Sequence, residues 1–336
     1  MNNLFAAHHF NEPLTQHGEE QFRNAAIALF RRQGIDNEIY RKFLNHLGIN
    51  VYEVNDILQI PFLPISFFKT HLLQTGSFVP ETIFESSGTT GSINSKHGIY
   101  SLKHYLDNTL VNFREVYGDP GQYCFLALLP SYLEKGNSSL VAMAAYLMQE
   151  SGHPENGFYL NNFGELVAQL SKLESESQQV ILLGVTYALM DLAERYDLAL
   201  KHVIVMETGG MKGRKKEVTR AELHALLKEK LGVREIHAEY GMTELQSQAY
   251  AVRDGIFRPS STLKVLLRSP DDPFEIWHAN QYPGRTGIIN IIDLANIHTQ
   301  AFIATDDLGR FSPGGGFELL GRVDNCDIRG CSLLAV

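Results

Sequence analysis

Ser86-Ser87-Gly88-Thr89-Thr90-Gly91-Ser92 is the stretch of this chain that says most about its fold and its chemistry. Such a loop can present backbone N–H groups and hydroxyls to one anion at little steric cost, as the phosphates of a nucleotide require. The stretch lacks the Gly-Lys-Ser/Thr end of a Walker loop, which argues against a P-loop ATPase or kinase. Composition alone supports a flexible surface loop equally well.

The segments on either side of this loop predict an α/β fold. Before it, apolar residues recur at helical spacing over 19–47, and the prolines of 60–65 require an extended connector. After it, short apolar runs alternate with helix-period segments, as in βαβ units around a largely parallel sheet. The expected strand and helix pairs are 123–129 with 138–149, 180–183 with 187–195, and 203–206 with 220–231.

After about residue 245 the pattern changes to strands separated by turns rich in proline and glycine. Before that point, Thr219 and Glu222 have the spacing of a capping box, and Gly232 follows the end of the same helix. Gly314-Gly315-Gly316 predicts a hairpin turn in the later part. The strands expected there include 262–267, 287–293 and 317–320. The expected organisation is a helical segment over 1–80, an αβ nucleotide-binding subdomain over 81–245, a β-rich subdomain over 246–322 and a short tail over 323–336.

Composition narrows the class of protein. The 336 residues are 44% hydrophobic and 20% charged, which is typical of a soluble globular chain. The formal net charge of -9 disfavours nucleic acid as a partner. No segment has the pattern of a secretion signal or a membrane span, so we expect a cytoplasmic protein. The three cysteines form no CxxC pair and no zinc spacing.

Four further segments accompany the loop at 86–92. Thr208-Gly209-Gly210-Met211 follows one predicted strand, and Glu239-Tyr240-Gly241-Met242-Thr243-Glu244 follows another. Thr305-Asp306-Asp307-Leu308-Gly309-Arg310 lies in the β-rich part, and Gly321-Arg322-Val323-Asp324 opens the C-terminal tail. In this order and spacing, the five segments resemble those of adenylate-forming enzymes, the superfamily of acyl-CoA synthetases, luciferases and peptide-synthetase adenylation domains.

Within that superfamily, the chain most resembles the acyl-protein synthetase (LuxE-type) family. The likeness extends nearly end to end, from the helical start through Ile60-Pro61-Phe62-Leu63-Pro64-Ile65-Ser66-Phe67-Phe68-Lys69 to the ending Gly330-Cys331-Ser332-Leu333-Leu334. It implies the N-terminal large domain of adenylate-forming enzymes: a helical start, mostly parallel αβ sheets and a β-rich subdomain. It also implies that the C-terminal lid domain and its catalytic lysine are absent, because the chain ends soon after Arg322.

The resemblance implies an AMP-forming ligase. ATP and a carboxylic acid, expected to be a fatty or hydroxy-fatty acid, would give an acyl-adenylate and pyrophosphate, and the acyl group would pass to a protein thiol. Charge neutralisation is then the main catalytic demand. One alternative is an aryl- or acyl-CoA ligase related to phenylacetate-CoA ligases. Another is a non-catalytic nucleotide-binding subunit that has lost its lid. Without the lid lysine, the reaction would proceed unaided, depend on a partner that completes the site, or be weak.

By match to the family, the loop at 86–92 would hold the β- and γ-phosphates and Thr243 would contact the α-phosphate. Glu244 would ligate Mg²⁺, a hard cation suited to carboxylate and phosphate oxygens, although it could instead be a charge at a helix N-terminus. Tyr240, beside Gly241, would stack on adenine, although it could be a core aromatic residue at a strand end. Gly209, Gly210 and Met211 would line the adenine and acyl pocket, although Gly209 and Gly210 could form only a βα turn.

Asp307 and Arg322 complete the nucleotide site that the resemblance implies. Asp307 would bind the ribose hydroxyls, or it could be an Asx-turn residue between strands. Arg322 would contact ribose or phosphate, or it could pair with Asp324. Both readings stay open for each residue at this point.

The thiol that receives the acyl group is a separate question. Acyl-protein synthetases are thought to pass the acyl group to a cysteine near their own C-terminus and then to a partner protein. Cys331 follows Arg329 by two residues, and a nearby guanidinium favours the thiolate nucleophile. Cys326 is a second candidate, and an inert tail cysteine is the alternative for both. Cys124 lies in an apolar run and is expected in the core.

Overall fold

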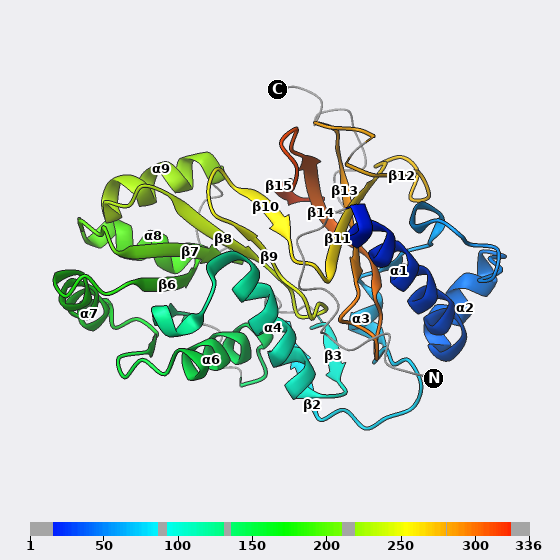
Figure 1. Cartoon of the computed structure of the whole chain (residues 1–336), viewed down its shortest axis with the longest axis horizontal. Coiled ribbons are helices and arrows are strands. Elements are labelled where there is room, and N and C mark those ends of the chain that lie inside the picture. Colours follow the sequence, from blue (N-terminus) through cyan, green and yellow to red (C-terminus); the bar gives the residue numbers. More distant parts are fainter. Residues whose placement is uncertain (1–15, 87–92, 131–135, 210–218, 280, 324–336) are drawn as a thin grey trace.

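The computed structural model describes residues 16–86, 93–130, 136–209, 219–279 and 281–323. It confirms the α/β fold. In these ranges one sheet of 13 strands runs through the molecule, with helices on both faces of one half and the N-terminal helices beside the other half (Figure 1). The strand order is β12-β11-β13-β14-β15-β10-β9-β8-β7-β6-β4-β5, with β1 paired to β14.

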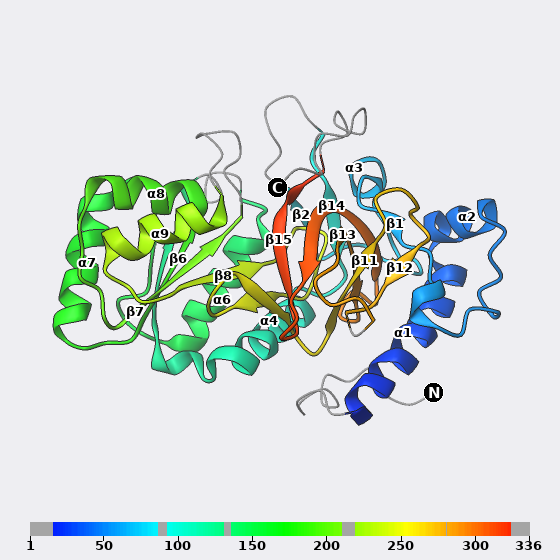
Figure 2. The same ribbon diagram turned by 90° about the horizontal axis from the view of Figure 1, so that it is seen from above.

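One half of the sheet is parallel, as the alternating pattern predicts. Helices α8 and α9 cover one face of it, and α4 and α6 cover the other (Figures 1 and 2). Burial from both sides explains why its central strands are continuous apolar runs. The strands of this half are β4 (Cys124–Leu128), β5 (Gly157–Tyr159), β6 (Val180–Val185), β7 (Val203–Thr208) and β8 (Ile236–Tyr240). Its helices are α4 (Leu102–Tyr117), α6 (Ser139–Ser151), α7 (Phe163–Ser175), α8 (Thr186–Arg195) and α9 (Arg220–Leu231).

The ends of α9 are those that the sequence predicts. The hydroxyl of Thr219 accepts from the backbone N–H of Glu222 at 3.2 Å, and the Glu222 carboxylate accepts from the N–H of Thr219 at 2.8 Å. Gly232 ends the helix with φ of +69°. A Cβ there would lie 2.6 Å from the carbonyl oxygen of Leu198, so glycine is required by both conformation and space.

The other half of the sheet is antiparallel, and the change to strands after residue 245 is confirmed. The predicted hairpin turn joins β14 to β15, where Gly315 and Gly316 have φ of +85° and +81°. The strands are β9 (Ala249–Ala251), β10 (Ile256–Pro259), β11 (Leu263–Arg268), β12 (Ile276–Trp277), β13 (Thr286–Asp293), β14 (Phe302–Phe311) and β15 (Phe317–Arg322). The subdomain boundaries expected at 80/81, 245/246 and 322/323 stay a proposal.

The N-terminal segment packs on this antiparallel half. Phe30 meets Phe302 edge to face, with ring centroids 5.8 Å apart. The extended connector is confirmed, since its Leu63 pairs in parallel with Ile303 of β14. The elements of this segment are α1 (Gln16–Asp36), α2 (Glu38–His46), the 3-10 turn η2 (Ile57–Gln59), β1 (Leu63–Pro64) and α3 (Phe67–Thr70).

Several elements lie outside the sequence prediction: α4, α7, the short 3-10 turn η3 (Pro120–Gln122), and the hairpin of β2 (Thr82–Glu85) and β3 (Lys96–Ile99) that flanks the loop at 86–92. The buried face of α4 includes the polar residues Asn108, Thr109 and Asn112, so it lacks a purely apolar stripe. None of the helices in the described ranges is both long and apolar enough to span a membrane.

Candidate active site

The neck of the glycine-rich loop is closed by Ser86 and Ser95. The N–H of Ser86 donates to the carbonyl of Ser95 at 3.0 Å, and the N–H of Ser95 donates to the hydroxyl of Ser86 at 2.9 Å. This reciprocal pair fixes the points at which the loop leaves and rejoins the hairpin. The loop residues Ser87, Gly88, Thr89, Thr90 and Gly91 lie outside the described residues.

Glu244 lies in a turn after β8 and is 5% exposed. No helix begins there, so the helix-charge interpretation is wrong. Burial raises the pKa of Glu244, while a hydrogen bond from Ser95 and the charge of Arg322 act in the opposite direction. The carboxylate is therefore close both to the loop neck and to the C-terminal strand.

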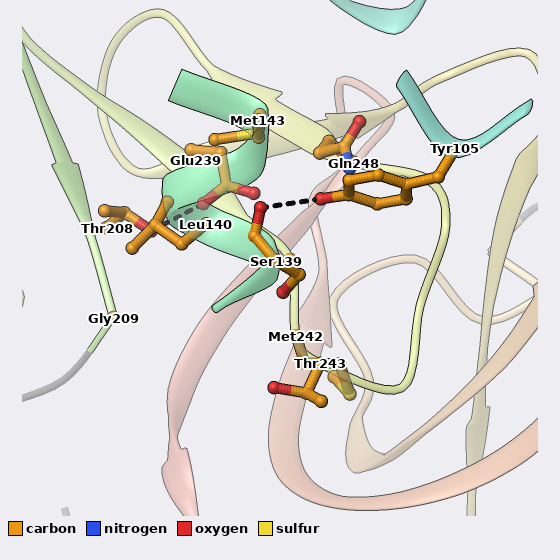
Figure 3. Close-up of a pocket in the computed structure, with 11 residues that line it drawn as sticks. Tyr105, Ser139, Leu140, Met143, Thr208, Gly209, Glu239, Met242, Thr243 and Gln248 are labelled. Atoms are coloured by element: carbon orange, nitrogen blue, oxygen red, sulfur yellow. Dashed lines mark hydrogen bonds between the residues drawn. The ribbon is translucent and has the colours of Figure 1, made fainter. Parts of the chain in front are cut away.

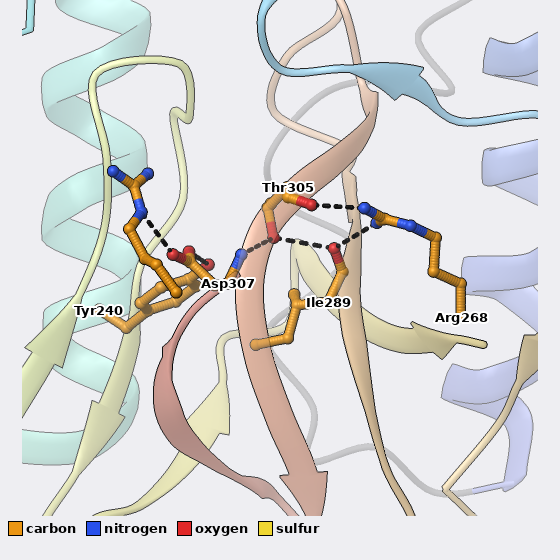
Figure 4. Close-up of polar contacts among 6 residues, drawn as sticks. Tyr240, Arg268, Ile289, Thr305 and Asp307 are labelled. Carbon is orange, nitrogen blue, oxygen red and sulfur yellow. Dashed lines mark hydrogen bonds and ion pairs between the residues drawn. The ribbon is translucent and has the colours of Figure 1, made fainter. Parts of the chain in front are cut away.

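Asp307 bonds to both Tyr240 and Arg322. Figure 4 shows its carboxylate beside the ring of Tyr240. It lies inside β14 opposite Arg322 of β15, so it is not a turn residue between strands. Its Oδ1 accepts from Nε of Arg322 at 3.0 Å, and its Oδ2 accepts from the Tyr240 hydroxyl at 2.9 Å. Among the described residues, Arg322 pairs with Asp307. Asp324, the partner that the sequence also allowed, lies outside them, so that pairing stays untested. The backbone N–H of Asp307 donates to the hydroxyl of Thr305 at 3.1 Å, which fixes the approach of the chain.

The ring of Tyr240 is packed among aromatic residues. Its centroid lies 6.0 Å from that of Phe257 and 5.7 Å from that of Phe317, both edge to face. Burial and the neighbouring Asp307 hold the pKa of its hydroxyl well above the ordinary range. This packing matches a core aromatic residue at a strand end, and stacking on adenine stays a prediction.

His97 holds the segment that carries Thr243. Its Nδ1 lies 2.7 Å from the carbonyl oxygen of Thr243, and its Nε2 lies 2.8 Å from the Thr299 hydroxyl. Burial lowers the pKa of His97 to about 4, so the ring is neutral near pH 7. Because a carbonyl oxygen only accepts, Nδ1 carries the proton. The side chain of Asn296 donates to the next carbonyl, that of Glu244, at 2.8 Å.

The turn after Glu244 is fixed by one buried carboxylate. Asp293, at the end of β13, accepts from the N–H of Gln246 at 2.7 Å and from the hydroxyl of Ser247 at 2.6 Å. Burial raises the pKa of Asp293 in spite of these bonds. His97, Asn296 and Asp293 are not predicted from the sequence, because nothing in their local patterns distinguishes them from other polar residues.

The end of β7 is held in a similar way. The Thr186 hydroxyl lies 3.1 Å from Oε2 of Glu207 and 2.8 Å from the carbonyl oxygen of Gly209. Burial would raise the pKa of Glu207, but a hydrogen bond with His224 and the charge of Arg220 outweigh it, so the pKa is lowered. Gly209 has φ of +70°, as a tight turn after a strand requires. Gly210 and Met211 lie outside the described residues.

A pocket opens between the ends of β7 and β8 and the helices α4 and α6 (Figure 3). Its volume is about 450 Å³, counting the part open to solvent. The lining residues are Tyr105, Ser139, Leu140, Met143, Thr208, Gly209, Glu239, Gly241, Met242, Thr243 and Gln248. Gly209, Gly241 and Thr243, all implied by the resemblance, thus line one space.

Glu239 is a pocket residue that the sequence reasoning did not single out. It is 7% exposed and accepts a hydrogen bond of 2.5 Å from the Thr208 hydroxyl. Burial raises the pKa of Glu239 to about 7. A charged residue inside the otherwise apolar end of a strand, directly before Tyr240-Gly241, is the signal that could have revealed it.

Two further sequence expectations concern metal and thiol groups. In the described ranges, no cluster of three or more His, Cys, Asp or Glu side chains could hold a metal ion. A single carboxylate such as that of Glu244 is compatible with Mg²⁺ binding, because Mg²⁺ can take one protein carboxylate and complete its shell with phosphate oxygens and water. Cys124 is buried in the core as expected, and burial raises its pKa to about 12. Cys326 and Cys331 lie outside the described residues.

The site residues come together in two groups. Ser86, Glu244, Tyr240, Asp307 and Arg322 surround the C-terminal end of β8 and the loop neck. The pocket forms the second group, and Thr243 connects the two through its neighbour Glu244.

Solved structures of adenylate-forming ligases share this fold. An open conformation of 2-hydroxyisobutyryl-CoA ligase with 2-HIB-AMP and CoA matches with a TM-score of 0.64 and 11% identity, over 91% of this chain and 70% of the ligase. The same ligase in its thioesterification state matches with a TM-score of 0.65 and 12% identity, over 93% of this chain and 69% of the ligase. O-succinylbenzoate CoA synthetase from Bacillus subtilis with AMP matches with a TM-score of 0.51 and 15% identity, over 73% of this chain and 50% of the synthetase. At these identities the likeness shows the fold alone.

No curated protein sequence matches the chain. The family profile of LuxE, acyl-protein synthetase, matches residues 4–335, which is nearly the whole sequence. The chain therefore belongs to the LuxE acyl-protein synthetase family.

Proposed function

We propose that this chain activates a carboxylic acid with ATP, forming an acyl-adenylate and pyrophosphate, and then transfers the acyl group to a protein thiol. The observation that supports this most is the position of Glu244. One buried carboxylate lies close to the neck of the glycine-rich loop on one side and to Arg322 and Asp307 on the other. Three distant parts of the chain thus meet where a nucleotide and its cation would bind.

The first step needs the acid and the α-phosphate to meet. Thr243 lines the pocket, and its carbonyl is held by His97. A carboxylate bound in the pocket would therefore lie beside the residue expected to contact the α-phosphate. One carboxylate oxygen forms a bond to the α-phosphorus while the bond to the bridging oxygen breaks, and pyrophosphate carries away the electron pair. The loop at 86–92 would hold that leaving group.

Mg²⁺ would supply positive charge at this point, with Glu244 as its protein ligand. Burial raises the pKa of Glu244 because the ionised carboxylate has little water around it. A bound cation would remove this penalty, and the remaining ligands would come from phosphate oxygens and water. Asp307 and Arg322 would contact the ribose, with Tyr240 behind them and Gly241 beside the adenine.

Two grounds support the proposed thiol acceptor: one of the three cysteines can be excluded, and the family suggests a cysteine near the C-terminus. Cys124 is buried and its pKa is raised by burial, so it is a poor nucleophile. Cys331, or less favourably Cys326, remains the candidate on this chain, and an acceptor or carrier protein would follow. A reducing compartment such as the cytoplasm would keep such a thiol free. The acid proposed from the family is a fatty or hydroxy-fatty acid.

CoA is the second candidate acceptor, because solved structures with a similar fold include CoA ligases. Labelled CoA thioester in the reaction mixture, in the absence of labelled protein, would favour it.

Exchange of [³²P]pyrophosphate into ATP tests the first step. We expect exchange that depends on both Mg²⁺ and a carboxylic acid, and its loss in Glu244→Gln. Glu38→Gln is the matched control, since Glu38 only forms an exposed pair with Lys42 and its loss should leave the exchange rate unchanged. A folded wild-type protein without exchange over a broad panel of acids would favour a non-catalytic nucleotide-binding protein.

Radiolabelled acid tests the second step. We expect a label on the protein that hydroxylamine removes, as for a thioester, and that Cys331→Ser lacks. A label that survives in Cys331→Ser and disappears in Cys326→Ser would reassign the acceptor.

A further inference from the structure

Two polar side chains pack over Gly241 in the wall of the pocket. A Cβ at Gly241 would lie 2.4 Å from Oε1 of Glu239 and 3.7 Å from Cγ of Gln248. Both side chains therefore approach the backbone of the same residue, and both line the pocket (Figure 3). Glycine at 241 leaves the room that this approach requires.

These side chains leave hydrogen-bond acceptors without donors. Oε2 of Glu239 accepts from Thr208, and no other donor reaches this carboxylate from the described residues. Oε1 of Gln248 is buried and has no hydrogen-bond partner in the described part of the chain, although the residue is only 3% exposed. Buried acceptors without donors are unfavourable and are uncommon in folded proteins.

A purely structural role for Glu239 fits less well. A neutral buried carboxyl would be expected to donate its proton to a nearby acceptor, yet no hydrogen bond joins Glu239 to Gln248. A structural ion pair is also missing, because no cationic side chain among the described residues pairs with Glu239. Among the described residues no further donor remains for Glu239, so a ligand that fills the pocket would be a source of one.

The rest of the lining defines the body of that ligand. Leu140, Met143 and Met242 supply apolar contacts, and Thr243 marks the end at which the reacting carboxylate would lie. The pocket thus combines an apolar wall with two polar side chains, Glu239 on β8 and Gln248 directly before β9 (Figure 3). A plain alkyl chain would bury the Glu239 carboxylate without giving it a further donor.

We propose that the acid bound in this pocket carries a hydroxyl or amino group that donates a hydrogen bond to the carboxylate of Glu239. This inference rests on the proposed function and narrows its substrate from a carboxylic acid in general to a hydroxy or amino acid. An unsubstituted fatty acid would be a poor substrate.

A panel of acids with one carbon skeleton tests the inference in the pyrophosphate exchange assay. The panel contains the unsubstituted acid and its hydroxy, amino and methoxy derivatives, each at several positions along the chain. We expect the best hydroxy or amino acid to exceed the unsubstituted acid in kcat/KM by on the order of 100-fold or more. The methoxy acid accepts but does not donate, so it should gain nothing.

Variants at Glu239 separate the two donor groups. Glu239→Leu should bring the ratio of kcat/KM between substituted and unsubstituted acids close to one. Glu239→Gln should keep a preference for a hydroxyl and lose a preference for an ammonium group, because the negative charge is gone. Glu235→Gln is the matched control, since that residue pairs with Lys228 outside the pocket and its loss should leave the preference intact.

The outcomes distinguish this inference from the proposed function. Equal or better exchange with unsubstituted acids, or a donor preference that survives Glu239→Leu, would overturn the inference and leave the ligase activity standing. No exchange with any acid would overturn the proposed function. In that case thermal shifts with AMP and the same acids still test the pocket, because donor-bearing acids should stabilise the wild type more than Glu239→Leu. Equal shifts would reject the inference.

Discussion

Replacing Glu239 by glutamine should change how the stability of the protein depends on pH. Burial raises the pKa of Glu239 from 4.5 to about 7 in the folded state. Between these values the folded protein holds a proton that the unfolded chain has lost. Raising the pH through this interval therefore destabilises the wild type, whereas glutamine cannot titrate.

The size of the effect follows from the pKa values. For each pH unit between the pKa in the unfolded chain and the pKa in the folded protein, the free energy of unfolding falls by about 1.4 kcal/mol. The interval from 4.5 to about 7 therefore corresponds to about 3 kcal/mol. As the pH rises across this interval, the free energy of unfolding of Glu239→Gln should increase by roughly this amount relative to that of the wild type. The amide can still accept from Thr208, so the comparison isolates the ionisation.

Urea unfolding at a series of pH values measures the difference. The protein has a single tryptophan, and Trp277 is buried in the antiparallel half, so its fluorescence reports on that core. Circular dichroism reports on the helices of the other half, and coincident transitions would justify a two-state analysis. Glu235→Gln is the control, because Lys228 lowers the pKa of Glu235 and the wild-type trend should persist.

A free-energy difference between Glu239→Gln and the wild type that stays constant from about pH 4.5 to about pH 9 would refute the reasoning. It would mean that Glu239 ionises as readily in the folded state as in the unfolded chain. Such a Glu239 would have no need of a donor group on the bound acid.

Three further changes test the surrounding contacts by urea unfolding. Tyr240→Phe removes the hydrogen bond to Asp307 and should lower the free energy of unfolding by about 1.5–3 kcal/mol; a change within experimental error would show that this bond contributes little. Gly241→Ala places a Cβ 2.4 Å from Oε1 of Glu239 and should cost about 1–3 kcal/mol, most of which Glu239→Ala should restore in the double variant. Burial lowers the pKa of His97 from 6.5 to about 4. As the pH falls through this interval, the unfolded chain takes up a proton before the folded protein does, so the free energy of unfolding of the wild type should fall by up to about 3 kcal/mol. A His97→Phe variant with the same acid slope would exclude that residue as the cause.

The parallel half of the fold could be predicted from the sequence because its signals are local. Apolar runs mark β4, β6 and β7, and the capping box at Thr219 marks the start of α9. The hairpin after β14 is equally local, since consecutive glycines supply the left-handed conformations that it needs. Such features depend on a few neighbouring residues and on no distant contact.

Other features could not be predicted because they depend on distant parts of the chain. Asn108 and Asn112 lie on the buried face of α4 because their side chains bond to the segment after Glu244. His97 is buried because the carbonyl of Thr243 reaches it across the fold. A polar residue in sequence gives no sign of a partner more than a hundred positions away, so periodicity alone misses such elements and such residues.

The contacts of Asp307 could not be predicted from the sequence either. Its sequence context allows a turn as well as a strand, and only the pairing of β14 with β15 places it opposite Arg322. Its other partner, Tyr240, belongs to a third strand, β8. A motif predicted the residue, but the register of two strands determines its partners.

The alternation of side chains along β8 divides the two groups of site residues. Glu239 points to the pocket beside α4 and α6, whereas Tyr240 points to β14, β15 and Asp307 (Figures 3 and 4). Successive residues of a strand face opposite sides, so the proposed acid site and the proposed nucleotide site lie on the two faces of one strand. Thr243 follows the end of this strand, where the two sides meet. A register shift of one residue in β8 would exchange the two side chains and destroy both groups at once. Glu207 and its neighbours on β7 pair with β8 in fixed register, so the geometry of the proposed site depends on the parallel half that the sequence predicts best.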